Sequence, residues 1–306
     1  MKKQVFCIIL VLAVGLGLFP AEKSKPRFYL KFDGIGSIAS GGDFQDFADR
    51  NETYFNSLAQ YPDLYTISFT KKPFFRGFGG EIGVAVKSYA VGISFGYIEK
   101  NIHIEYHHAD STSGYKEDYT RDHTFSAIPI FLFIHYKLID SRFLTAYFTI
   151  GEGVYLATYR DDRSITYEGY KNPKGLPITE AVSVIESKKN RLGFHVGATI
   201  DLNITANLAL SLAAGYRLVS FKDMVAESYY KDNLEEDTGE GDFYYWINNK
   251  NESSQFTIGA PTNKANWDGE PAKLNMNGFS FSVGIKITLG SNKKSKTEKI
   301  AVPEEY

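Results

Sequence analysis

Residues 279–289 read FSFSVGIKITL, and their apolar and polar side chains alternate along the whole stretch. Apolar residues stand at the odd positions from Phe279 to Leu289, and small or polar residues at the even positions from Ser280 to Thr288. A helix would scatter the polar residues around its circumference, whereas successive side chains of a strand point to opposite faces. The stretch therefore predicts a β-strand with one apolar face and one polar face.

The same alternation recurs along the chain. It predicts eight strands, at residues 27–38, 77–88, 89–104, 122–138, 142–158, 190–204, 206–222 and 276–290. Each contains about 10 residues or more, which is long for a soluble sheet and suits a tilted strand that crosses a bilayer.

The connections between these strands alternate between short and long. The sequences KSYA, IDSR and TAN make three tight turns, while the other four connections are long and polar. Both chain ends then fall on the side of the short turns. This is the plan of a bacterial outer-membrane barrel with short periplasmic turns and long extracellular loops.

The predicted fold class is thus all-β: an eight-stranded antiparallel up-and-down transmembrane β-barrel over residues 27–290. The alternative is a soluble β-sandwich or lipocalin-like barrel, which would bury the apolar face and expose Gly, Ser and Thr. Four long loops on one side fit that alternative poorly.

The first 21 residues, MKKQVFCIILVLAVGLGLFPA, have the basic start and short apolar run of a secretory signal peptide. An uncleaved anchor is the alternative. Cleavage after Ala21 is expected, although Phe19 fits the usual pattern poorly and leaves the site open. The only cysteine, Cys7, lies in this segment, so no disulfide is expected in the exported protein. Residues 291–306 form a polar tail.

Four segments carry a resemblance to a known family: AIPIFLFIHYKL, FLTAYFTIGEGVYL, FHVGATIDLNITANLALSLAAGYRLV and FSFSVGIKITL. Together they resemble the outer-membrane β-barrel domain family of OmpA/OmpW-like eight-stranded barrels. The resemblance implies a small barrel in the bacterial outer membrane, and it covers most of residues 27–290.

Two features depart from that family pattern. The polar tail means that the chain does not end on a terminal aromatic strand residue, so the barrel assembly machinery would recognise an internal strand. Glu152 falls on the lipid-facing parity. We expect it near the outer headgroups, where an acidic side chain costs little, or at a local bulge.

The inward parity carries charges of both signs. The candidate polar network of the lumen comprises Lys31, Asp33, Glu81, Lys87, His135, Lys137, His195, Asp201, Arg217 and Lys286. An eight-stranded barrel is just wide enough for its own side chains to fill it. These residues are therefore expected to plug the lumen as a network of salt bridges and water, with a narrow conducting path as the alternative.

The sequence HIEYHH raises the question of an enzyme. His103, Glu105 and His107 would share one strand face, an arrangement suited to metal ligands or an acid–base pair. The segment is expected to fray into a solvated loop instead. Lipid A deacylases and acyltransferases are also eight-stranded barrels with His and Ser at the rim, but no motif matches theirs. We therefore expect no catalytic residue, no cofactor and no metal.

The long loops hold the remaining signals. We number the four long connections loops 1 to 4 in chain order. In loop 1, apolar residues recur at helical spacing, which predicts a short amphipathic helix across the barrel mouth; they are Phe44, Phe47, Ala48, Phe55 and Leu58. Loop 4 contains the acidic residues Glu235, Glu236, Asp237, Glu240 and Asp242, without EF-hand spacing. Beside them stands the aromatic block Phe243, Tyr244, Tyr245 and Trp246, which could contact lipopolysaccharide, a glycan or a protein.

These features define the expected partners and function. Outer-membrane lipid and lipopolysaccharide, the assembly machinery and an extracellular ligand at loops 1 and 4 are the expected partners of a monomer. A net charge of −2 speaks against nucleic acid. The first hypothesis is a non-enzymatic surface barrel with a plugged lumen, whose loops bind a partner or strengthen the envelope. A minor pore for small solutes and a lipid A-modifying enzyme are the alternatives.

Overall fold

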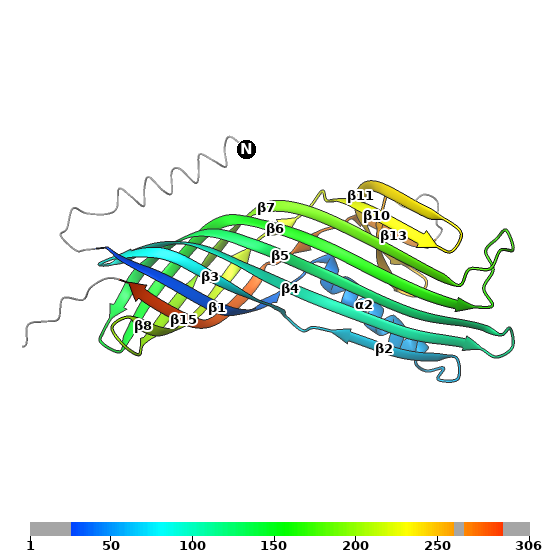
Figure 1. The fold of residues 1–306 in the computed structure, drawn as a ribbon, viewed down its shortest axis with the longest axis horizontal. Helices are drawn as coiled ribbons and strands as arrows, with labels where there is room; N and C mark the ends of the chain where they lie inside the picture. The colour runs from blue at the N-terminus through cyan, green and yellow to red at the C-terminus, as the bar shows by residue number, and fades with distance from the viewer. Residues whose placement is uncertain (1–25, 260–265, 290–306) are drawn as a thin grey trace, which may run out of the picture.

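Eight strands close into an antiparallel barrel in the computed structural model, which describes residues 26–259 and 266–289 (Figure 1). The ring runs through β1 (Arg27–Ala39), β3 (Phe75–Val86), β4 (Tyr89–Asp110), β5 (Tyr115–Asp140), β6 (Leu144–Glu168), β7 (Glu180–Asn203), β8 (Leu208–Leu218) and β15 (Gly278–Leu289). The predicted all-β barrel is confirmed. The predicted signal peptide and polar tail lie outside the described residues.

The first and last strands of the ring close it. β1 pairs with β15 from Phe28 opposite Leu289 to Ala39 opposite Gly278. Consecutive strands join through short turns at residues 87–88, 141–143 and 204–207, at the end of the barrel where β1 begins and β15 ends (Figure 1). No helix among the described residues has both the length and the apolar character needed to cross a bilayer.

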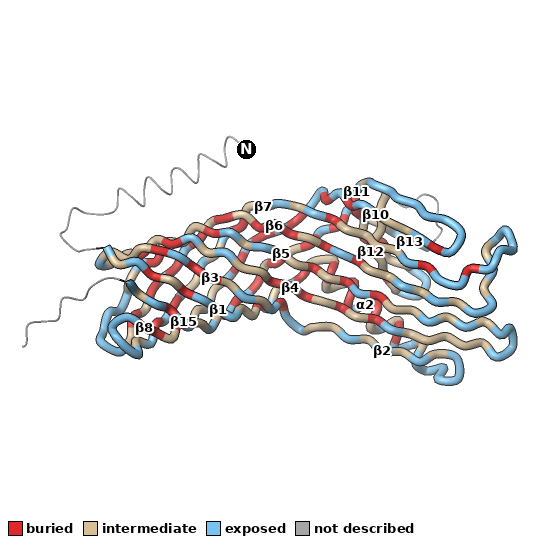
Figure 2. Tube along the Cα trace, viewed as in Figure 1, coloured by how far each residue is buried: buried red, intermediate tan, exposed pale blue. Residues whose placement is uncertain are grey.

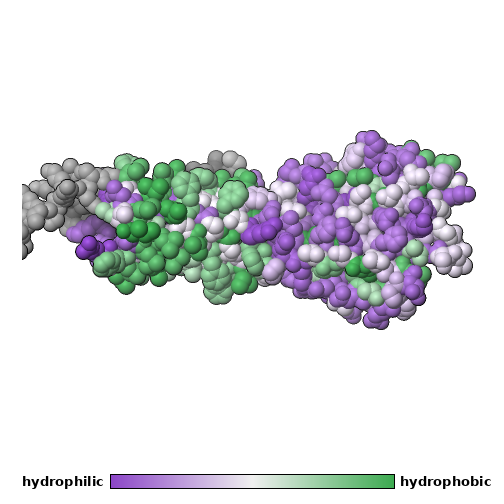
Figure 3. All heavy atoms as spheres, turned by 60° about the horizontal axis from the view of Figure 1, so that its bottom comes forward, coloured by the Kyte–Doolittle hydropathy of each residue, from purple (hydrophilic) through white to green (hydrophobic). Residues whose placement is uncertain are grey.

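The apolar face of every barrel strand points outward. Phe32, Ile93 and Ile285 are 58%, 57% and 52% exposed, far more than a water-soluble protein would tolerate over one continuous surface. We call this surface the belt. On the face that Figure 3 shows, hydrophobic side chains cover the barrel part of the molecule and mostly hydrophilic ones cover the other part. The inward face carries small and polar residues, with aromatic residues toward its outer end. This inside-out arrangement rules out the soluble alternative, and a closed barrel satisfies its backbone in a bilayer because it has no free edge.

Glu152 lies within the belt on its lipid-facing side. Its register with Leu132 on β5 and Phe194 on β7 is continuous, so no bulge turns it inward. Val154 and Leu156 continue the apolar face beyond it toward the outer end. The alternative of a local bulge is therefore wrong, and Glu152 lies two outward positions inside Leu156. Its expected place near the outer headgroups stays a prediction.

Half of the ring continues far beyond the belt. β4, β5, β6 and β7 have 22, 26, 25 and 24 residues, against 13, 12, 11 and 12 for β1, β3, β8 and β15. Residues 105–121 and 159–189, expected to be loops, are mostly strand, with turns at 111–114 and 169–179. The HIEYHH segment is likewise strand, and it does not fray.

These long strands form the wall of an outer lobe, by which we mean the described part of residues 40–74, 99–126, 157–191 and 219–277. β2 (Tyr65–Lys71) pairs with β4, and β10 (Val225–Asp232) pairs with β7. β11 (Glu236–Asn248) pairs with β10, β12 (Ser254–Ile258) and β13 (Trp267–Pro271). β9 (Ser220–Phe221) and β14 (Leu274–Asn275) form a separate two-stranded pair. Loop 4 is thus a small sheet.

The predicted helix of loop 1 is confirmed as α2 (Asp43–Leu58), which buries Phe44, Phe47, Ala48 and Phe55. Its direction differs from the expectation. The Phe44 ring lies 5.8 Å from Phe125, whereas the Phe55 ring lies 6.0 Å from Tyr106. Tyr106 pairs with Tyr119, six residues along β5 from Phe125 and hence about 20 Å farther out. The helix therefore runs along the long strands and does not lie across the mouth (Figure 1).

The core of the outer lobe is aromatic. Phe44 and Phe47 of α2 pack against Phe125, Tyr159 and Phe256. Phe243 and Tyr245, from the aromatic block of loop 4, are buried in the same core. Figure 2 shows buried residues alternating with exposed ones along the strands of both the barrel and the lobe.

Candidate functional site

The barrel interior gathers most of the residues predicted for it. Lys31, Glu81, His135, Asp201, Arg217 and Lys286 are buried, while Asp33 and His195 are partly buried. Lys87 and Lys137 instead line a larger cavity at the end of the barrel with the short turns. Lys87 is exposed there in the turn between β3 and β4, with φ 41°.

A chain of hydrogen bonds crosses the lumen. The Tyr29 hydroxyl donates to Glu81, and the same carboxylate oxygen lies 2.7 Å from His135 Nε2. His135 Nδ1 lies 2.9 Å from the Thr149 hydroxyl, which is 3.3 Å from that of Thr199. The chain thus links β1, β3, β5, β6 and β7 across the ring. Sequence reasoning omitted Tyr29, although its parity, shared with Lys31, was the available signal.

A second polar contact lies beside this chain. Lys286 Nζ bonds to an Asp201 oxygen at 2.7 Å. The same ammonium lies 4.6 Å from the centre of the Tyr29 ring and 4.7 Å from that of Tyr147, within cation–π range. Lys31 and Asp33 form another ion pair at 3.2 Å. Three interior carboxylates therefore each contact a Lys or His.

These contacts separate two cavities. One of about 100 Å³ lies on the outer side and is lined by Glu81, His135 and Thr199 among others. The other, of about 610 Å³, opens at the end with the short turns and is lined by Tyr29, Tyr147 and Lys286 among others. The two share no lining residue.

Aromatic side chains fill the outer end of the barrel. The Phe125 ring lies 5.6 Å from Phe75 and 5.8 Å from Phe221. Tyr155 packs edge-on against Phe131 at 5.2 Å. All five side chains are buried. They join the core of the outer lobe, so α2 and the loop 4 sheet rest on a packed apolar layer.

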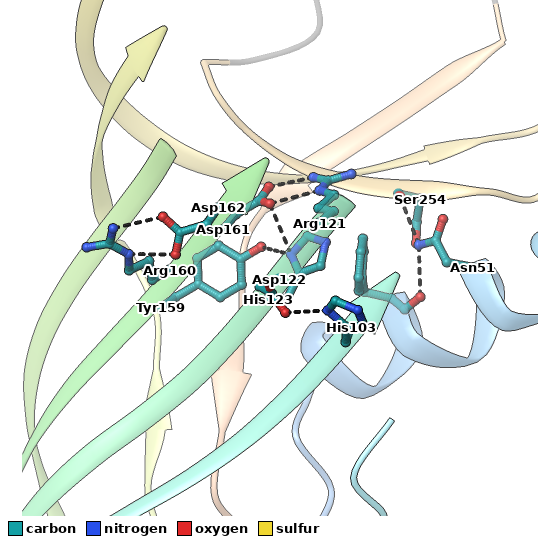
Figure 4. Close-up of polar contacts among 11 residues, drawn as sticks. Asn51, His103, Arg121, Asp122, His123, Tyr159, Arg160, Asp161, Asp162 and Ser254 are labelled. Atoms are coloured by element: carbon teal, nitrogen blue, oxygen red, sulfur yellow. Dashed lines mark hydrogen bonds and ion pairs between the residues drawn. The ribbon is translucent and has the colours of Figure 1, made fainter. Parts of the chain in front are cut away.

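The outer lobe contains a buried polar cluster that sequence reasoning missed (Figure 4). Arg121 on β5 donates two hydrogen bonds to Asp161 on β6, at 2.8 and 2.5 Å. His123 Nδ1 lies 2.7 Å from the Tyr159 hydroxyl and 3.6 Å from Asp161. The Phe47 ring of α2 lies 4.2 Å from the His123 ring. The cluster holds β5, β6 and α2 together.

Burial and charge set the protonation of this cluster. Burial lowers the pKa of His123 well below its ordinary value, so the ring is neutral at pH 7. Burial alone would raise the pKa of Asp161, but the Arg121 guanidinium outweighs it and holds that pKa below its ordinary value. A charged pair beside a neutral imidazole is thus sealed inside the lobe. His123 Nε2 has no hydrogen-bond partner among the described residues.

His103 and His107 of HIEYHH lie on the outer surface of β4, whereas His108 lies on its other face and stacks on Tyr65 at 4.6 Å. His103 Nδ1 lies 2.7 Å from Asp122, and Nε2 lies 3.3 Å from Glu105. The hydrogen bond to Asp122 raises the pKa of His103. His107 pairs with Asp118 in the same way. The described residues contain no group of His, Cys, Asp and Glu side chains arranged to hold a metal ion.

The loop 4 signals divide between surface and core. Glu240 lies on the exposed β10–β11 hairpin, opposite Glu227. Of the aromatic block, Phe243, Tyr245 and Trp246 are buried. Most of that block therefore supports the lobe from within and is not offered to a ligand.

Comparisons with known proteins place the chain beside outer-membrane barrels of solved structure. It is similar to the outer membrane protein OprG from Pseudomonas aeruginosa, with 8% identity, a TM-score of 0.38, and coverage of 88% of this chain and 98% of that one. It is also similar to a major outer membrane protein from Thermus thermophilus, with 11% identity, a TM-score of 0.35, and coverage of 86% of this chain and 99% of that one. For Neisserial surface protein A the identity is 13% and the TM-score 0.27, with coverage of 86% of this chain and 97% of that one.

At these TM-scores the assignment to a membrane rests on the closed ring, the outward belt and the short turns at one end. The chain is a bacterial outer-membrane β-barrel protein. No protein-family model matches its sequence, and no curated protein sequence matches it.

Proposed function

We propose that the barrel is a closed, non-enzymatic anchor in the outer membrane, and that its function resides in the outer lobe. The observation that carries this proposal is the pair of barriers inside the barrel. The Tyr29–Glu81–His135 chain with Lys286–Asp201 forms the inner barrier. The aromatic layer around Phe125 forms the outer one.

Planar-bilayer recording of the refolded protein tests the closed lumen. Refolding is first verified by the shift in gel mobility on boiling. We expect no discrete conductance steps from the wild-type protein. A variant with Tyr29→Ala and Tyr147→Ala, which opens only the inner barrier, should also remain silent. Reproducible steps from the wild-type protein would refute the closed barrel.

A minor pore is the second candidate, and one observation favours it. The cavity of about 610 Å³ reaches the layer formed by Tyr29, Tyr147 and Lys286 from the end with the short turns. A small movement of that layer and of the aromatic layer would be needed for a path. Under this candidate the wild-type protein conducts, and Lys286→Met changes its ion selectivity.

The outer lobe supports a binding or envelope-strengthening role because it is a packed structure on rigid strands. Lipopolysaccharide and an extracellular partner are the ligands we propose for it. Removal of residues 228–239 in favour of an Asn-Gly turn shortens the β10–β11 hairpin and keeps Ala226 and Phe243 in the core. Shortening the 169–179 turn is the matched control.

Binding of the nanodisc-embedded protein to lipopolysaccharide and to whole cells is then measured. We expect loss with the first variant and retention with the control, with both barrels folded. Unchanged binding in both variants would remove the hairpin from the proposal.

Lipid A from cells with His103→Ala should keep its acylation pattern, because His103 contacts two carboxylates and no hydroxyl among the described residues.

A further inference from the structure

Arg217 is the buried cation of the barrel interior that needs a counter-ion. It lies near the outer end of β8, opposite His195 of β7 and Gly278 of β15. Its side chain faces the lumen, and the residue is only 8% exposed. A guanidinium stays charged under all conditions a protein experiences. The charge is therefore held inside the barrel permanently.

The other two buried cations of the interior each have a carboxylate. Lys31 lies 3.2 Å from Asp33, and Lys286 lies 2.7 Å from Asp201. Among the described residues, Arg217 has neither an ion pair nor a hydrogen bond, and its buried Nη1 has no acceptor. Buried charges are ordinarily paired because an unpaired charge in a low-dielectric interior is costly.

The cavity of about 100 Å³ lies against this guanidinium. Arg217, His195 and Ser280 contribute polar groups to its wall, and Phe131 and Tyr155 contribute apolar ones. Two carboxylates also line it: Asp33 contacts Lys31 at 3.2 Å, and Glu81 contacts His135 at 2.7 Å. The Ser280 hydroxyl lies 3.5 Å from His195 Nε2, at the edge of hydrogen-bond distance. The same hydroxyl donates to the Gly215 carbonyl at 3.4 Å. Both contacts of this hydroxyl are long, so an acceptor placed in the cavity would compete with them.

We propose that this cavity binds a small planar monoanion, a short carboxylate or nitrate, on Arg217. The guanidinium presents its N–H groups as a planar fork that matches two oxygens of such an anion. The carboxylates of Asp33, Glu81 and Asp201 contact Lys31, His135 and Lys286, so none of them contacts the guanidinium, and a monoanion in the cavity would supply that contact. The cavity admits an ion of acetate size, and Phe131 with Tyr155 provides an apolar wall for a methyl group.

The test uses the full chain, refolded in micelles with sodium acetate or sodium gluconate at equal ionic strength. Gluconate has the same charge and carboxylate, but its hydroxyl groups do not match the apolar wall of Phe131 and Tyr155. Heat unfolding is followed by gel mobility. Acetate at about ten times its Kd should raise the ratio of folded to unfolded protein about tenfold over gluconate. Nitrate should act like acetate, because it presents two oxygens in the same plane to the guanidinium.

Three variants decide the matter. Arg217→Met should lose the difference between acetate and gluconate, and Arg217→Lys should keep a weaker one because it retains the charge without the fork. Lys137→Met is the control, since Lys137 lines the other cavity and already pairs with Asp140 at 2.9 Å. It should respond to acetate like the wild-type protein.

Two results would overturn the proposal. One is an equal response of the wild-type protein to acetate and gluconate, which would leave Arg217 solvated by water alone. The other is an acetate response that survives in Arg217→Met. If that variant does not refold, saturation transfer from the wild-type protein to ¹³C-acetate, with nitrate as competitor and Arg217→Lys as comparison, gives the same decision.

Discussion

Asp161→Asn should open the outer lobe while the barrel stays folded. Asp161 accepts two hydrogen bonds from Arg121, and the two side chains are 2% and 8% exposed. The substitution leaves the buried guanidinium without its counter-charge, and removing one partner of such a pair costs about 3–5 kcal/mol. The equilibrium for local opening of the lobe should then rise by roughly 150- to 5,000-fold.

Hydrogen exchange measured by mass spectrometry resolves this effect by region. Peptides from α2 and β12, which cover the cluster, should lose protection, while peptides from β1 and β15 should keep it. Asp162→Asn is the matched control, because the Asp162 side chain is 42% exposed and its partner Arg160 is 50% exposed. That exposed pair contributes less than about 1 kcal/mol. Equal loss of protection in the two variants would refute the assigned role of the buried pair.

Three further predictions follow from local geometry. Because burial lowers the pKa of His123, its contribution to lobe stability is complete above about pH 6.5 and declines as the unfolded state takes up a proton below it. The protection of α2 amides, after correction for the intrinsic exchange rate at each pH, should be lower at pH 5 than at pH 7, and equal protection would contradict this. Gly153→Ala places Cβ 2.0 Å from the Ile130 carbonyl oxygen, whereas Gly36→Ala meets nothing within 4 Å, so refolding yield on gels should fall only for the first. Phe47→Ala removes a fully buried ring and should lower the local stability of the lobe by about 3–5 kcal/mol in hydrogen exchange, with unchanged protection as the contrary result.

The barrel was predictable because the bilayer imposes a two-residue period on every strand. Outside the belt, apolar and polar residues no longer alternate along the strands. On β5, the inward residues Arg121 and His123 are polar, and so are the outward residues Asp122 and Thr124. Water on one side and a buried ion pair on the other leave both faces polar. Hydropathy alone therefore placed the end of this strand at residue 122, while the structure begins it at Tyr115.

The interior residues were predictable by parity, but their partners were not. Parity places Glu81, His135 and Arg217 on the inner face without saying which of them meet. Meeting depends on the stagger of strands around the ring, which brings Glu81 to His135 and leaves Arg217 beside His195. The Arg121–Asp161 pair joins residues 40 positions apart. Only the register of β5 against β6 reveals it.

The pairing of β1 with β15 also sets an order of events during biogenesis. Residues 219–277, which build β9 to β14, lie between β8 and β15 in the chain, yet their described part sits on the outer side of the barrel. They must pass through the membrane before β15 joins β1 along its full register, from Phe28–Leu289 to Ala39–Gly278. The pairing of the last strand with the first is thus completed only after residues 219–277 have crossed the membrane. A mutation that delays that crossing should leave the chain in the membrane with β1 and β15 unpaired.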